Sequence, residues 1–128
     1  MASTRNAQKL MTTTLQFGVD VTQYLCVNFN LTTGVLQLPR VEGHRAVGVT
    51  QEAVDFSVNP YGKVATLGHT KVVAGGTILA GDAVMAQTTG KVIVATGANV
   101  QVGIAMQSAV ATDVFEILLV PGGESSVS

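Results

Sequence analysis

The chain has 128 residues, of which 47% are hydrophobic and 12% charged. That balance excludes a disordered chain and fits one compact domain. The 21 Val, 15 Thr and 14 Gly residues favour strands joined by turns over helices. The net charge of −1 and the pI near 6.0 argue against direct nucleic-acid binding, which normally goes with a basic excess.

The N-terminal stretch, residues 1–17, is polar, Thr-rich and without a repeating apolar face, and Arg5 and Lys9 give it a positive charge. Two interpretations stay open: a frayed terminus, or an arm that orders on a neighbouring subunit. We therefore predict a flexible or partner-ordered arm over 1–17, a β-barrel domain over 18–122 and a polar tail over 123–128. The start has no apolar core suited to a signal peptide, so we expect a protein made in a cytoplasm, with no membrane contact.

The first half of the remaining chain alternates apolar and polar residues with a period of two, which predicts strands with one buried face. The turn signals are Thr32-Thr33-Gly34 and Asn59-Pro60-Tyr61-Gly62, where Pro and Gly suit β-turns. The predicted strands cover residues 25–31, 36–38, 47–49, 63–67 and 70–73.

The second half is more regular, and its connections are too short for parallel crossovers. We predict strands at 77–79, 83–86, 92–95, 100–106 and 115–119. Many short antiparallel strands indicate a small β-barrel or sandwich. At most one or two short helical turns are expected, near residues 50–54 or 107–111.

One internal similarity links the halves. Residues 46–51 (AVGVTQ) are matched by residues 101–106 (QVGIAM), each with Gly inside a short strand, as at a close backbone approach. Two similar halves closing one barrel would explain the match, and so would chance similarity between Val-Gly-rich strands.

The ionisable side chains form no pattern that indicates catalysis. His44 and His69 have no ligand partner at metal-binding spacing, the acids are dispersed singly, and Cys26 lies on an apolar strand without an adjacent base. Residues 75–81 are glycine-rich but lack the Lys-Ser or Lys-Thr of a phosphate loop. We therefore expect no enzyme activity, no cofactor, no metal and no small-molecule substrate.

Charge is distributed unevenly along the chain. Residues 1–91 hold all seven basic residues and five acids, whereas residues 92–128 hold three acids and no base. Unpatterned surface charge is one interpretation. A head-to-tail association of identical subunits is the other.

Residues 71–84 (KVVAGGTILAGDAV), 89–91 (TGK), 102–109 (VGIAMQSA) and 116–120 (EILLV) together resemble the capsid decoration (cement) proteins of tailed bacteriophages. The resemblance covers about residues 23–120. It implies a small, β-tulip-like barrel that binds the outer surface of an icosahedral head as a homotrimer at three-fold and quasi-three-fold sites. Such a protein clamps the major capsid protein against internal DNA pressure, and Arg5 and Lys9 are the candidate contacts of the arm.

Two other readings remain open. A phage tail-tube or head-completion protein would share the structural role but would assemble as a larger ring. Residues 73–84 also resemble the hairpin sequence pattern of biotinyl or lipoyl carrier domains and of small sugar-binding domains. Against the carrier, Lys91 follows Thr89-Gly90 and lacks the acidic or Met neighbours of a modified lysine.

Overall fold

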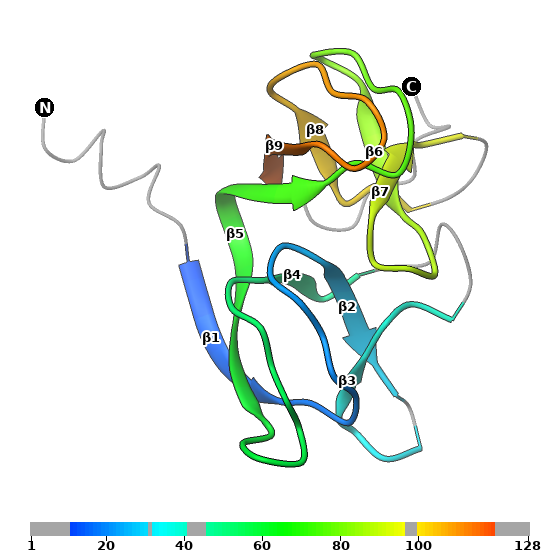
Figure 1. The fold of residues 1–128 in the computed structure, drawn as a ribbon. Coiled ribbons are helices and arrows are strands. Elements are labelled where there is room, and N and C mark those ends of the chain that lie inside the picture. Colours follow the sequence, from blue (N-terminus) through cyan, green and yellow to red (C-terminus); the bar gives the residue numbers. More distant parts are fainter. Residues whose placement is uncertain (1–10, 31, 41–45, 97–99, 120–128) are drawn as a thin grey trace, which may run out of the picture.

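The computed structural model describes residues 11–30, 32–40, 46–96 and 100–119, which contain nine strands and no helix. The paired strands run antiparallel and curl into two stacked lobes (Figure 1). The prediction of an all-β antiparallel fold is confirmed. The strands are β1 (Met11–Gln16), β2 (Cys26–Phe29), β3 (Leu36–Gln37), β4 (Gly48–Thr50), β5 (Tyr61–Val73), β6 (Ala83–Ala86), β7 (Val92–Val94), β8 (Gly103–Ala105) and β9 (Val114–Leu119).

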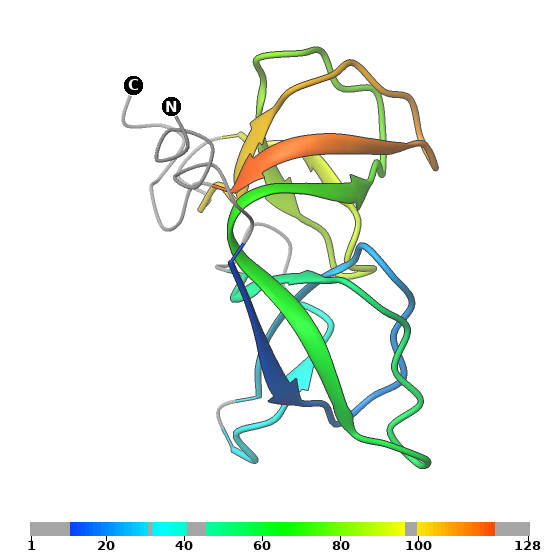
Figure 2. The ribbon, with the colours of Figure 1, turned by 90° about the vertical axis from the view of Figure 1, so that its left-hand side faces the viewer.

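Strand β5 belongs to both lobes. Its first part pairs with β1 and β4, and its second part pairs with β9. The sequence predicted two strands here, at 63–67 and 70–73. The structure joins them because Gly68 adopts a φ of +99°, which lets the backbone bend without ending the strand. Figure 2 shows β5 turning from one lobe into the other.

The pairing of strand β1 differs from the predicted boundary between the arm and the barrel at residues 17 and 18. It pairs with β5 over its whole length, from Met11 opposite Leu67 to Gln16 opposite Tyr61, and Phe17 is only 1% exposed. Residues 11–17 therefore belong to the barrel and not to an arm. Nearly all of β1 is exposed, so it lacks the alternation by which strands are recognised. The rest of the predicted arm, residues 1–10, and the predicted tail, residues 123–128, lie outside the described residues, as do residues 120–122.

The two lobes repeat the same fold. We call residues 11–67 the first half and residues 68–119 the second half. β1 to the start of β5 in the first half corresponds to the end of β5 through β9 in the second, with the same pairings. The interpretation of two similar halves is thereby supported far beyond residues 46–51. Matched isolated bridges join Phe17 to Leu36 and Ala74 to Val92 (both parallel), and Val21 to Val54 and Ile78 to Ala109 (both antiparallel).

Neither 50–54 nor 107–111, the two places considered for a short helical turn, is helical, and the reason is the same in both halves. Val54 exchanges two backbone hydrogen bonds with Val21, at 2.9 and 3.0 Å, and Ala109 does the same with Ile78, at 2.8 and 2.9 Å. Such reciprocal pairs require an extended backbone.

Glycine is required at one equivalent position in each half. A Cβ on Gly48 would collide with the carbonyl oxygen of Ala65, and one on Gly103 with that of Leu118. These are the two glycines of the internal sequence match, and the close approach predicted there is confirmed.

Each half has its own apolar core. The core of the first half is built around Phe17, Leu36 and Val64. The larger core of the second half includes Ile78, Phe115 and Ile117, and it also takes in Cys26 and Val49 from the first half. The buried surface is thus continuous across the region where the halves meet.

Candidate interaction surfaces

The two halves meet at a junction that is held by hydrogen bonds. Gln51, after β4, donates a side-chain hydrogen bond of 2.8 Å to the hydroxyl of Thr70 on β5. The amide of Val73 donates to the carbonyl of Tyr24 at 3.2 Å, and the amide of Cys26 donates to the carbonyl of Gly90 at 2.7 Å. Gly90 fits closely because a Cβ there would lie 2.9 Å from Cβ of Leu25.

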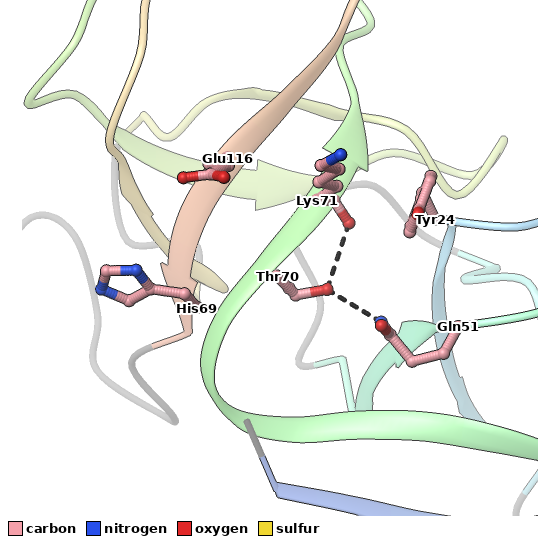
Figure 3. A pocket seen from close by; sticks show the side chains of 6 residues that line it. All are labelled: Tyr24, Gln51, His69, Thr70, Lys71 and Glu116. Atoms are coloured by element: carbon pink, nitrogen blue, oxygen red, sulfur yellow. Dashed lines mark hydrogen bonds between the residues drawn. The ribbon is translucent and has the colours of Figure 1, made fainter. Parts of the chain in front are cut away.

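A cleft of about 230 Å³ opens at this junction (Figure 3). Two of its residues come from the first half and four from the second. The Thr70 hydroxyl, between the Gln51 amide and the Lys71 carbonyl, forms its floor, while the side chains of His69 and Lys71 are exposed. The arrangement ties the two halves together by neutral hydrogen bonds and presents charged groups at the rim. Its lining residues are Tyr24, Gln51, His69, Thr70, Lys71 and Glu116.

A second hollow of about 230 Å³ lies beside the β4–β5 turn of the first half. Its two carboxylates are already engaged by the chain: Glu52 accepts the Lys63 amide at 2.9 Å, and Asp55 accepts the Ser57 hydroxyl at 2.7 Å. Both acids therefore fix turns.

The structure separates the residues that sequence reasoning considered for chemistry. His69 is exposed on β5, whereas Cys26 is fully buried, and this burial raises the pKa of its thiol to about 12. Within the described ranges, no three His, Cys, Asp or Glu side chains come together as a metal site would need. Arg5, Lys9 and His44 lie outside the described residues. In the same part of the chain, no helix is long and apolar enough to cross a membrane.

Lys91 does not stand on a free hairpin tip. The preceding Gly90 is buried and bonded to Cys26 across the junction, and the Lys91 amide lies 3.4 Å from the Thr89 hydroxyl.

Sequence reasoning missed an apolar patch on the loops of the second half. We call Leu79 and Val110, in these loops, and Val114, at the start of β9, the loop-edge patch; they are 62%, 56% and 51% exposed. The loops that carry it lie side by side, since the amide of Ala80 donates to the Ser108 hydroxyl at 3.1 Å. The equivalent residues of the first half are Thr22, Asp55 and Tyr61. Once the halves are aligned, this change from mostly polar to apolar residues can be read from the sequence.

Comparison with known proteins adds one informative match. No family model and no curated protein matches the chain. Among solved structures, the chain is similar to the N base of the head fibre gp8.5 of bacteriophage phi29, with a TM-score of 0.69 and 16% sequence identity. The match covers 88% of this chain and 95% of the other. At this identity, the match shows that the two chains share a fold.

Proposed function

We propose that this chain is a structural protein of a tailed-phage head, a decoration protein that binds the outer surface as a homotrimer and stabilises the expanded shell. Its partner is the major capsid protein, and its role needs no catalysis, cofactor, nucleic acid, membrane or small-molecule substrate. The observation that carries the proposal is the fold shared, over nearly the full length of both chains, with a protein described as the base of a phage head fibre. The resemblance of residues 23–120 to phage decoration proteins supports it independently.

The surface suits binding by many small contacts. The loop-edge patch exposes two apolar side chains on short loops and a third at the start of β9, and short, well-paired segments lose little conformational entropy on docking. One such patch is weak, but three patches of a trimer that bind one lattice together gain avidity. We assign the loop-edge patch to the contact with the capsid.

Titration of purified protein onto expanded, undecorated phage shells tests the proposal. The number of copies bound per shell should saturate at a multiple of three, and decorated shells should melt at a higher temperature than bare ones. Val110→Ser should lower occupancy at a fixed concentration. The matched control is Val58→Ser in the first half, where Val58 is 81% exposed but lies outside the patch. No binding to shells would overturn the decoration role.

A second candidate, the base of a head fibre, is favoured by the description of the structural neighbour itself. A fibre base would occupy the shell at few positions and leave its melting temperature unchanged. Occupancy and melting therefore separate the two roles. Intact-mass measurement tests the carrier alternative, because a biotinyl or lipoyl group would add mass at Lys91.

A further inference from the structure

The hydrogen bonds across the junction join different positions of the two halves. The first half contributes the Tyr24 carbonyl, the Cys26 amide and the Gln51 side chain. The second half contributes different positions of the repeat. Those positions are Thr70, Val73 and Gly90.

Because the halves repeat, each junction residue has an equivalent that the junction does not use. Matching backbone bonds fix these equivalents. For example, the amide of Tyr24 donates to Thr50 as Gly81 does to Ala105, both at 2.8 Å. The unused equivalents of the first half's contacts are Gly81, Ala83 and Met106 on the second half. The unused equivalents of the second half's contacts are Thr13, Gln16 and Gly34 on the first half.

Both unused sets are accessible. Met106 is 45% exposed, and Ala83 is partly exposed where its equivalent Cys26 is fully buried. Gly81, Thr13, Gln16 and Gly34 are all exposed. The chain thus carries, on opposite halves, one free copy of each side of its own junction.

The backbone of β1 is oriented to form the same contact. The amide of Phe17 donates to Pro60 at 2.7 Å, toward β5. Successive amides of a strand point to opposite edges, so the Gln16 amide points away from β5. The equivalent Val73 amide points outward in the same way and donates to Tyr24. Among the described strands, β1 pairs only with β5, so its outer edge is open.

We propose that copies of this chain associate head to tail by repeating the internal junction. Met106, Gly81 and Ala83 of one copy receive Thr13, Gln16 and Gly34 of the next. The Gln16 amide donates to the Gly81 carbonyl of the neighbouring copy, and Met106 packs on Thr13 where Gln51 bonds Thr70. One-way contacts of this kind close into rings or extend into filaments. The inference names the interface of the proposed homotrimer, but its test needs no phage shell, so failure here and failure of head binding are separate results.

Two lysine variants test the two faces by sedimentation over a concentration series. Met106→Lys and Thr13→Lys should each raise the dissociation constant at least about tenfold, because the new ammonium group would be desolvated at the contact. A mixture of the two variants restores one unaltered interface and blocks the other. We therefore expect dimers, and nothing larger, from the mixture.

The repeat itself supplies matched controls. Thr14→Lys should leave association unchanged, because the equivalent residue of the second half is Lys71, which lies at the junction rim without preventing it. Met106→Gln should retain or tighten association, since it copies Gln51 and can bond the Thr13 hydroxyl. Thermal unfolding of each variant at low concentration checks that the fold is kept.

Cross-linking gives a second readout that does not depend on weakening. Thr13→Cys/Met106→Cys, treated with a short bis-maleimide, should form covalent oligomers, and Gln51→Cys/Thr70→Cys should form only an internal bridge. Cys26 is buried and does not compete. A wild-type protein that stays monomeric overturns the proposal. So do lysine variants that associate like Thr14→Lys, a variant mixture that stays monomeric, or a Thr13→Cys/Met106→Cys protein that gives no covalent oligomers.

Discussion

The large aromatic of each core comes from opposite strands in the two halves. In the first half, Phe17 follows β1, and Gly62 of β5, which pairs with Leu15, lies against the Phe17 ring. A Cβ on Gly62 would lie 3.2 Å from Cε1 of Phe17 and would collide with Cγ2 of Val54. In the second half, the equivalents of Phe17, Gly62 and Val54 are Ala74, Phe115 and Ala109. The aromatic ring has moved across the strand pair, and the residues beside it have become small.

This exchange allows a prediction for variants in which the core of the first half is given the side chains of the second half. Phe17→Ala should cost roughly 3–5 kcal/mol, because a ring that is 1% exposed leaves a cavity. Gly62→Phe alone should also destabilise by about 1–3 kcal/mol through overpacking. The triple variant Phe17→Ala/Val54→Ala/Gly62→Phe recreates the second half's packing, and volume-conserving exchanges of this kind usually cost less than about 1.5 kcal/mol. The triple variant should therefore be more stable than Phe17→Ala, although it carries two more substitutions.

Urea unfolding followed by far-ultraviolet circular dichroism measures the three free energies. A loss of 3–5 kcal/mol is a large share of the roughly 5–15 kcal/mol expected for a domain, so the single variants should unfold at clearly lower urea. Phe115→Ala in the second half is the matched control, with a similar expected loss and no compensating partner. If the triple variant is no more stable than Phe17→Ala, the two cores do not pack alike and the structural equivalence fails.

Three further predictions concern single residues and are checked by equilibrium unfolding. Gly103→Ala should cost at least about 2 kcal/mol because its Cβ would collide with the Leu118 carbonyl, whereas Gly76→Ala, with its nearest contact at 3.8 Å, should change stability by less than about 1 kcal/mol. Thr50→Ala should cost only about 1 kcal/mol. The Thr50 hydroxyl accepts a hydrogen bond from the Leu25 amide (3.0 Å) and donates one to the Thr22 carbonyl (2.7 Å). In the second half, the equivalent amide of Asp82 donates directly to the equivalent carbonyl of Leu79, at 3.0 Å, so the first half can do the same without the hydroxyl. A loss of several kcal/mol in the free energy of unfolding would contradict this. Burial raises the pKa of the Cys26 thiol from about 9 to about 12, so the thiol ionises at a lower pH in the unfolded chain than in the folded one. The free energy of unfolding should therefore fall as the pH rises from 9 to 12. Cys26→Ala should make this fall smaller, because it removes the thiol.

The strands that sequence reasoning located well are those with one buried face. Residues 83–86 were predicted with the observed bounds of β6, and residues 92–95 and 115–119 match β7 and β9 within one residue. Burial on one face imposes the period of two. β1 was missed because both its faces are largely exposed, and the halves of β5 were separated because a glycine bend resembles a turn signal.

The junction was beyond the reach of local patterns. Gln51 and Thr70 are 19 residues apart, and no local sequence pattern links them. The duplication was the available signal, and one of its segments, residues 46–51 and 101–106, was recognised. Aligning the halves throughout would have matched Thr-rich β1 to the end of β5 and identified it as a strand. Sequence similarity alone was too weak for that alignment, since Phe17 corresponds to Ala74 and Gly62 to Phe115.

The faces left free follow from the number of halves rather than from any residue type. A contact that joins different surfaces of two repeated units leaves one surface of each kind unused, whatever the sequence. The sequence decides only whether those surfaces remain exposed to solvent or are buried against a partner. At Gln51 the first half uses an amide that reaches Thr70, and at the equivalent site the second half exposes Met106. An exposed methionine side chain is apolar, so burying it against a partner is favourable. For that reason Met106, rather than the charged rim of the cleft, is the position where self-association should be most sensitive to substitution.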